Sequence, residues 1–336
     1  MTAYARARAA VDALMEFYDR DTGLWQPARP WWQSGNALQA LLDHIARYGS
    51  RDYLWVLDNT VDIQRSAYMF GEFRADSTDD TAWWALAMVR AYDLTGDTRY
   101  LDIAETGAAY IGSFWDGACG GGVWWDVPQR TYKNAISNEL YIKLLASLHN
   151  RIAADTACLA RALDAWHWFR DIGMINNENL VNDGLAIWSG ACENNGGETW
   201  TYNQGVILGA LTELSTATGD RSLLDSAQRI ASAAITSSRL SPDGILTEPC
   251  EDPTNGYGGA NDDAPSFKGI FVRNLGELDR VLPDRPFRSY LQRQARSAHA
   301  FGRNRLDQYG LHWAGPFDRA DAARQASAVD LLTAAH

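Results

Sequence analysis

The sequence predicts an all-α protein, an (α/α)6 barrel in which twelve helices form two concentric rings within one domain, residues 1–336. Apolar residues recur at helical spacing along most of the chain, and helices that are apolar nearly all round alternate with helices that carry a charged face. The loops also alternate between short and long, which places every long loop at one end. An open helical solenoid is the alternative arrangement. The last helix supplies the partner that the first hairpin lacks, and this favours a closed ring.

The predicted helices fall into two sets. The odd-numbered helices are amphipathic and are expected at 4–19, 52–68, 100–114, 156–173, 223–237 and 286–301. The even-numbered helices are apolar nearly all round and are expected at 31–48, 78–94, 134–152, 201–218, 267–281 and 322–335. Thr95-Gly96-Asp97 and Thr218-Gly219-Asp220 end two even helices in the same way, with glycine as the C-cap. This repeated ending supports a repeated architecture with the even helices inside.

Three long segments rich in Gly, Asn and Asp lie at 116–132, 176–198 and 241–265. Each connects an odd helix to the even helix that follows it, whereas connections from even to odd helices are short. The first long segment contains Gly120-Gly121-Gly122 and is expected to be a hairpin or an extended loop. The long loops therefore cover the N-termini of the inner helices, where they can form the walls of a cleft.

Asp79 and Asp80 are the central candidate residues. They follow Ser77-Thr78, an N-cap signal, and an aspartate in a first helical turn can serve simply as a cap. Two adjacent carboxylates are less easily explained this way, because like charges in a cleft push their two pKa values apart. One acid and one base is what glycoside hydrolysis requires. The pair is therefore the predicted catalytic site, at the floor of the cleft.

The other inner helices begin with aromatic and hydrogen-bonding residues, a combination suited to sugar rings and hydroxyl groups. The chain contains fourteen Trp and fourteen Tyr residues, and such aromatic content serves either a large core or sugar platforms. Singly, each of these residues could be a packing or capping residue; their shared position is the stronger signal. The predicted substrate-binding residues are Trp31, Trp32, Gln33, Trp125, Lys133, Asn134, Asn138, Asp183, Tyr202, Asn203, Gln204, Asp263, Phe267 and Lys268.

Composition excludes several functions. A net charge of −12 argues against a nucleic-acid surface, and the chain has no apolar run of membrane-spanning length. No signal peptide is visible, so the chain as it stands is expected in the cytoplasm, or outside the cell if a leader was removed. Four cysteines without zinc-site spacing are expected to be free thiols, with room for one disulfide among the three in loops. No cofactor or metal is expected; Glu251-Asp252 with Asp262-Asp263 is a weak calcium candidate beside the simpler interpretation of solvated loop charges.

Several motifs together resemble glycoside hydrolase family 76, the α-1,6-mannanases. They run in order through most of the chain and comprise Asp79-Asp80-Thr81-Ala82-Trp83-Trp84, Gly121-Gly122-Val123-Trp124-Trp125, Lys133-Asn134-Ala135-Ile136-Ser137-Asn138-Glu139-Leu140, Thr201-Tyr202-Asn203-Gln204-Gly205-Val206 and Phe267-Lys268-Gly269-Ile270-Phe271-Val272-Arg273. The resemblance implies an (α/α)6 fold and retaining endo-hydrolysis of α-1,6-linked mannan. It also implies that Asp79 is the nucleophile and Asp80 the general acid/base.

The expected substrate is α-1,6-linked mannan or a mannooligosaccharide, with no nucleic-acid or membrane partner and a monomeric chain. Short oligosaccharides are included because many relatives act outside the cell and this chain shows no secretion signal. Two other functions are weaker. A sugar isomerase or epimerase needs paired histidines, and none of the six histidines begins an inner helix. A non-catalytic mannan-binding protein would have no need for an intact aspartate pair.

Overall fold

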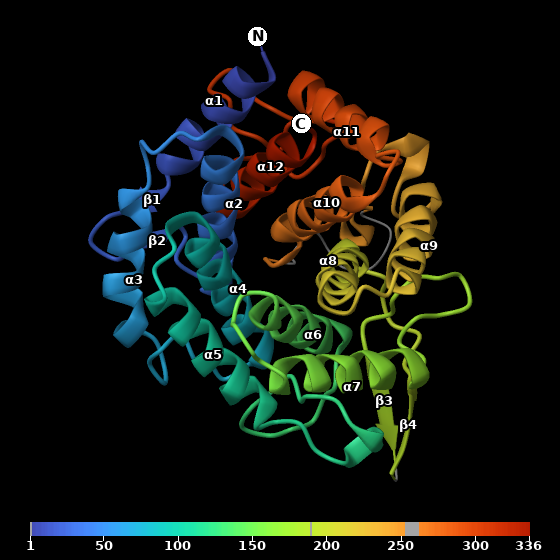
Figure 1. Ribbon diagram of the computed structural model, residues 1–336. Coiled ribbons are helices and arrows are strands. Elements are labelled where there is room, and N and C mark those ends of the chain that lie inside the picture. The colour runs from blue at the N-terminus through green and yellow to red at the C-terminus, as the bar shows by residue number, and fades with distance from the viewer. Residues whose placement is uncertain (1, 189, 253–261) are drawn as a thin grey trace. The chain divides into compact units, whose positions relative to one another are not determined.

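The computed structural model describes residues 2–188, 190–252 and 262–336 (Figure 1). These residues form twelve α-helices and two short antiparallel hairpins. The chain falls into two compact units: unit 1 comprises 1–64 and 234–336, and unit 2 comprises 65–233. The single domain expected from the sequence stays a prediction. No described helix is both long and apolar enough to cross a membrane.

Unit 2 is built on three inner helices, of which the middle one, α6, packs against both α4 and α8. All residues of α6 except His149 are buried, as expected for a helix surrounded by others. The outer helices bury one face each, and α5 and α7 pack on these inner helices. The helices are α4 (Thr78–Thr95), α5 (Arg99–Gly112), α6 (Ala135–His149), α7 (Ala157–Asp171), α8 (Thr201–Thr218) and α9 (Ser222–Thr236), the last ending in unit 1.

Unit 1 has the same construction. Its inner helices pack in the order α10, α12, α2, and all thirteen residues of α12 are buried. Helix α12 also packs against α1, which confirms that the last helix completes the first hairpin. The helices are α1 (Ala3–Met15), α2 (Trp32–Tyr48), α3 (Trp55–Ala67), α10 (Ala264–Val281), α11 (Arg288–Phe301) and α12 (Ala322–Ala334), with α3 running into unit 2. A hairpin of β1 (Tyr18–Asp19) and β2 (Leu24–Trp25) follows α1.

All twelve predicted helices are present, and their ends differ from the prediction by a few residues. The largest difference is in α1, which stops at Met15 instead of Asp19 because Tyr18 pairs with Trp25 across the β1–β2 hairpin. Gly96 and Gly219 end α4 and α8 in the left-handed conformation, at φ 72° and 73°. The expected glycine C-caps are therefore confirmed.

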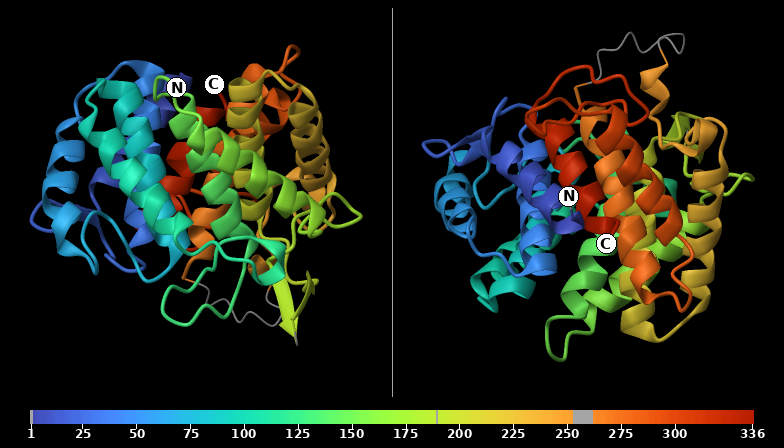
Figure 2. Two further views of the ribbon diagram at one scale, coloured as in Figure 1. Left: turned by 60° about the horizontal axis from the view of Figure 1, so that its bottom comes forward. Right: turned by 90° about the horizontal axis from the view of Figure 1, so that it is seen from above.

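The long loops are irregular, as their composition predicts. Segment 116–132 contains a 3-10 turn, η1 (Ala118–Gly120), and isolated bridges, so it is an extended loop and not a hairpin. Segment 176–198 does contain a hairpin, β3 (Leu185–Trp188) with β4 (Ala191–Asn194). Figure 2 (left) shows this hairpin and the α5–α6 loop at the same end of unit 2. Segment 241–265 includes η2 (Pro242–Gly244) and η3 (Pro249–Glu251), and its residues 253–261 lie outside the described part of the chain.

Charged side chains connect the inner helices within each unit, partly exposed in unit 2 and buried in unit 1. In unit 2, Arg151 makes a two-pronged ion pair with Asp93 of α4, at 2.7 and 2.8 Å, and a further pair with Glu213 of α8 at 3.2 Å. In unit 1, Arg273 of α10 donates to Asn36 of α2 at 2.6 Å and lies 3.5 Å from Asp330 of α12. In unit 1, removing one partner would leave a buried charge unpaired, so these contacts help to fix how α2, α10 and α12 pack.

In unit 1 the buried carboxylate of Glu251, in the long loop before α10, contacts Lys268 on α10 and His312 in the loop after α11. Glu251 lies 2.5 Å from Nζ of Lys268 on α10 and 3.0 Å from Nδ1 of His312. Burial alone would raise the pKa of Glu251, but the charge of Lys268 and the bond from His312 leave it lowered. The bond to Glu251 raises the pKa of His312 against the opposing effect of burial.

The raised pKa of His312 predicts a pH-dependent stability. A histidine whose pKa is higher in the folded than in the unfolded chain stabilises the fold below its unfolded pKa, and this contribution is lost as pH rises through the folded value. We therefore expect wild type to exceed His312→Gln in melting temperature at pH 5.5, with a smaller difference at pH 8.5. Thermal melts across this range check it, with the exposed His167→Gln on α7 correcting for the general effect of losing a histidine. A difference that stays constant or grows with pH would contradict the assignment.

Candidate active site

The N-terminus of α4 is fixed by the glycine-rich loop that precedes α6. Ser77, the N-cap residue, forms a β-bridge with Asp126. The backbone N–H of Thr78 donates to the carbonyl of Trp125 at 2.9 Å, and the Thr78 hydroxyl donates to the carbonyl of Trp124 at 2.8 Å. The start of α4 is therefore tied to a segment nearly fifty residues further along the chain.

Asp79 and Asp80 occupy the first turn of α4, and both side chains are partly exposed. An oxygen of Asp79 accepts a hydrogen bond from the backbone N–H of Asp80 at 3.1 Å. The unpaired N–H groups and the dipole of a helix N-terminus favour negative charge at this place. The pair thus combines solvent access with a local environment that suits a carboxylate.

One turn beyond the pair, aromatic side chains from two inner helices meet. Trp83 of α4 is buried and stacks on Tyr202 of α8, with ring centroids 6.5 Å apart and planes 22° apart. Tyr202 itself is partly exposed in the first turn of α8. Trp125, from the glycine-rich loop, is 39% exposed, which is unusual for a tryptophan. These rings provide apolar faces within the same unit as the aspartate pair.

Asp183 is held firmly at the start of α6. Its carbonyl accepts from the backbone of Ala135 at 2.8 Å, and its carboxylate accepts from the hydroxyl of Tyr132 at 2.5 Å and from the side chain of Trp200. Burial raises the pKa of Asp183, and the bonds from Tyr132 and Trp200 act in the opposite direction. The side chain remains partly exposed, so it is an oriented hydrogen-bond acceptor at a helix N-terminus.

Three of the predicted sugar ligands in unit 2 instead hold the backbone. Asn138 accepts from the N–H of Val123 and donates to its carbonyl, at 2.8 and 3.1 Å. Gln204 makes the same pair of bonds to Val181, both at 2.8 Å. Asn134 caps α6 by accepting from the N–H of Ser137. The amides of Asn138 and Gln204 fasten the long loops to the first turns of α6 and α8, and that of Asn134 caps α6.

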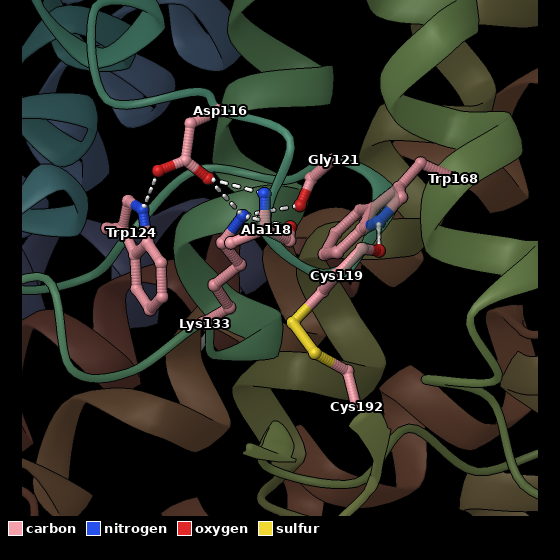
Figure 3. The surroundings of a disulfide bond; sticks show 8 residues. All are labelled: Asp116, Ala118, Cys119, Gly121, Trp124, Lys133, Trp168 and Cys192. Atoms are coloured by element: carbon pink, nitrogen blue, oxygen red, sulfur yellow. Dashed lines mark hydrogen bonds and ion pairs between the residues drawn. A yellow bond between two sulfur atoms is a disulfide. The ribbon is translucent and has the colours of Figure 1, made fainter. Parts of the chain in front are cut away.

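Lys133 is a buried anchor of the glycine-rich loop (Figure 3). Its ammonium group lies 3.0 Å from Asp116 and donates to the carbonyls of Ala118 and Gly121, both at 2.6 Å. The ammonium also lies 4.6 Å from the ring centre of Trp124. Because three bonds use all three ammonium protons, Lys133 anchors the loop in this structure, and sugar binding by Lys133 stays a prediction. Burial lowers its pKa, and Asp116 opposes that shift.

The same loop carries a disulfide, which the sequence allowed but did not identify. Cys119 is bonded to Cys192 on β4, 73 residues away in sequence, and thereby joins the α5–α6 loop to the β3–β4 hairpin (Figure 3). The carbonyl of Cys119 also accepts from the indole of Trp168 on α7 at 2.9 Å. Cys158 and Cys250 are free, so the prediction of four free thiols is wrong for two of them.

The predicted residues of unit 1 form a second cluster. Trp32 stacks on Phe267, with centroids 6.5 Å apart, and donates to Asp263 at 3.0 Å, and burial raises the pKa of Asp263. Gln33 donates to the carbonyl of Asp262 at 2.6 Å. Trp31 points elsewhere: it is buried and donates to Gln64 of α3.

Lys268, also predicted to bind sugar, repeats the arrangement of Lys133. It pairs with Glu251, donates to the carbonyl of Leu311 at 2.5 Å and lies 4.8 Å from the ring centre of Trp313. Its role in the structure is again to anchor a loop. Because Glu251 is committed to this anchor, it does not act as the loop carboxylate of a calcium site. Among the described residues, no group of three potential ligands could hold a metal ion.

Sequence reasoning did not assign a role to three residues that shape this region: Trp83, Asp116 and Glu139. Trp83 and Glu139 were visible within the family motifs, but nothing in their spacing distinguished them from core residues. Glu139 did carry a signal, because it is a carboxylate in the middle of an otherwise apolar inner helix. Asp116 became recognisable only through its contact with Lys133.

Comparison with known proteins gives the family. Residues 2–336 match the model described as glycosyl hydrolase family 76. The mannan endo-1,6-alpha-mannosidase DFG5 of Saccharomyces cerevisiae is 27% identical over 288 residues, which cover 79% of this chain and 60% of the relative. A putative mannan endo-1,6-alpha-mannosidase of Schizosaccharomyces pombe is 28% identical over 268 residues, covering 75% and 60%. The chain thus spans about three fifths of the length of these curated relatives.

Solved structures with a similar fold support this family assignment. The α-1,6-mannanase GH76A of Salegentibacter sp. HEL1_6 is 25% identical and superposes with a TM-score of 0.88 over 99% of each chain. A variant of that mannanase, inactivated by replacing two consecutive aspartates with asparagine, was solved in complex with α-1,6-mannotriose and has a TM-score of 0.89. The family 76 mannosidase of Bacteroides thetaiotaomicron, at 19% identity and a TM-score of 0.80, shares the fold. The fold is therefore the expected (α/α)6 barrel, and the chain belongs to glycosyl hydrolase family 76.

Proposed function

We propose that this chain hydrolyses α-1,6-mannosidic linkages in mannan or mannooligosaccharides by a retaining double displacement. The observation that carries the proposal is the adjacent pair Asp79 and Asp80, partly exposed in the first turn of α4 in a member of a glycoside hydrolase family. Such enzymes use two carboxyl groups beside the glycosidic bond. The printed activities of the relatives, mannan endo-1,6-alpha-mannosidase and α-1,6-mannanase, support the choice of linkage.

In the first step of the proposed mechanism, the Asp79 carboxylate attacks the anomeric carbon while Asp80 gives its proton to the departing glycosidic oxygen. This forms a mannosyl ester on Asp79 and releases the shortened sugar. In the second step, Asp80 takes a proton from water, whose oxygen attacks the anomeric carbon and displaces Asp79. Both carboxyls return to their starting states, and the two inversions give net retention.

The position of Asp79 at the start of α4 supports its assignment as the nucleophile. Asp79 accepts from the N–H of Asp80, a bond that favours its ionised form as a nucleophile. Support for sugar binding comes from Trp125, Tyr202 and the oriented acceptor Asp183, which are partly exposed in the same unit. Trp32, Phe267 and Asp263 of unit 1 stay predicted sugar ligands.

Replacing the aspartates tests the proposal. Asp79→Asn and Asp80→Asn are each expected to lower the rate of α-1,6-mannotetraose hydrolysis by at least about 10³-fold, because each removes a required carboxyl group. Chromatography of the products measures the rate. The exposed Asp76→Asn, three residues before the pair, is the matched control and should stay within about twofold of wild type because surface substitutions away from a site change little. Near-normal hydrolysis by either variant of the pair would refute the assignment.

The two roles are separable. An aryl α-mannoside with a good leaving group needs no protonation, so Asp80→Asn should regain activity on it while Asp79→Asn should not. NMR of the first-formed product should show the α-anomer. A β-anomer as first product would replace the retaining mechanism by an inverting one.

We also propose that the chain folds in an oxidising compartment, in contrast to the cytoplasmic location expected from the sequence. Support comes from the Cys119–Cys192 disulfide, since such bonds persist in secreted or periplasmic proteins and are rare in the cytosol. The bond connects two loops that are otherwise irregular. It therefore limits their freedom in the unfolded chain and holds the hairpin in place.

Reduction of this disulfide should destabilise the protein. We expect a reductant, or the double change Cys119→Ser with Cys192→Ser, to lower the free energy of unfolding by about 2–4 kcal/mol. Chemical denaturation with and without dithiothreitol measures this. The control Cys158→Ser removes a free thiol and should keep the full response to the reductant. Equal stability with and without the reductant would contradict a structural disulfide.

A further inference from the structure

Glu139 is a buried carboxyl group without a visible structural purpose. It lies in the second turn of α6, its side chain is fully buried, and neither of its oxygens has a hydrogen-bond partner among the described residues. Burying such a group destabilises a fold, and an apolar residue of similar size would pack better. Groups kept at this disadvantage are characteristic of functional sites.

The position of Glu139 relates it to Asp183. The backbone of Ala135 donates to the carbonyl of Asp183, and Glu139 follows Ala135 by four residues, so it lies on the same face of α6 one turn further in. Burial raises the pKa of Glu139 well above its usual value, and the charge of Asp183 raises it further. Burial and the charge of Asp183 thus both favour the neutral form of Glu139.

A second buried group without a hydrogen-bond partner among the described residues lies near the start of α8. Asn203 is fully buried, and neither atom of its amide has a partner among the described residues. It lies in the first turn of α8, three residues after the N-cap residue Trp200, whose side chain bonds to Asp183. Helices α6 and α8 pack directly against each other. Two buried polar groups thus lie in the first two turns of the helices whose N-terminal residues hold Asp183.

We propose that Glu139 and Asn203 are positioning residues for Asp183, which binds hydroxyl groups of the mannosyl substrate. This inference rests on the proposed function. Asp183 already accepts from Tyr132 and Trp200. The O–H of neutral Glu139 and the N–H of Asn203 are two further donors on its inner side, available when the carboxylate turns toward substrate hydroxyls. They hold the acceptor in place and confine one negative charge to it.

If Glu139 positions Asp183, replacing Glu139 should lower activity without lowering stability. Glu139→Leu removes the buried carboxyl group, so the melting temperature should stay the same or rise. The same change should lower kcat/KM for α-1,6-mannotetraose at least about tenfold, because misplacing a binding group is costly to the reaction. Glu139→Gln, neutral and able to donate, should restore most of what leucine loses. Ser137→Ala on the same helix removes a buried unpartnered hydroxyl and is the matched control, expected to leave kcat/KM unchanged.

A double-mutant cycle shows whether Glu139 acts through Asp183. In an Asp183→Asn background, Glu139→Leu should add little to the loss. Any of four results would overturn the inference: full activity of Glu139→Leu, a fall in its melting temperature together with its activity, no rescue by glutamine, or additive losses with Asp183→Asn. Failure of the wild type itself to cleave α-1,6-mannotetraose would refute the proposed function. In that case only the melting temperature of Glu139→Leu would test the inference, and a value below that of the wild type would overturn it.

Discussion

The arrangement of both units depends on how the backbone of the long loops is satisfied. A buried N–H or C=O without a partner is costly, and irregular loops cannot supply partners to each other as helices do. Here an amide side chain from an inner helix supplies both a donor and an acceptor to one loop residue: Asn138 to Val123 and Gln204 to Val181. In unit 1 the amide of Gln325 on α12 accepts from the N–H of Tyr309 and donates to a carbonyl of α1, at Ala10.

Two buried lysines also attach the long loops to the inner helices. Lys133 and Lys268 each combine a carboxylate, at least one loop carbonyl and a tryptophan face, so that the buried charge is paired and its protons are used in hydrogen bonds. The consequence for function is electrostatic. In unit 2 the Lys133 ammonium is enclosed in its loop anchor, so the groups left partly or fully exposed include Asp79, Asp80, Tyr202 and Trp125, whose carboxylates and rings suit neutral sugar hydroxyls.

The helices were predictable because their signals are local: apolar spacing, glycine C-caps such as Gly96 and Gly219, and the Ser77 N-cap act within a few residues. The place of Asp79 and Asp80 in the first turn of α4 was predictable for the same reason. The roles of the amide and lysine side chains that anchor the loops were not predictable in this way. An asparagine or lysine at a helix N-terminus has the same sequence signature whether it faces a sugar or a loop, and only the partner, such as Val123 for Asn138, decides. Likewise, the sequence restricted a disulfide to the loop cysteines, but pairing Cys119 with Cys192 requires knowing which loops meet.

Asn138 and Glu139 show that neighbouring buried polar residues of one helix can differ in role. Asn138 precedes Glu139, is equally buried, and uses its amide fully in holding a loop; Glu139 uses neither oxygen. Removing a satisfied anchor exposes unpaired backbone and destabilises the fold, whereas removing an unsatisfied carboxyl relieves a cost. Burial alone therefore does not separate structural from functional polar residues in the inner helices. The state of their hydrogen bonds narrows the choice, because a satisfied anchor such as Asn138 already has a structural role, whereas Glu139 has no hydrogen-bond partner among the described residues.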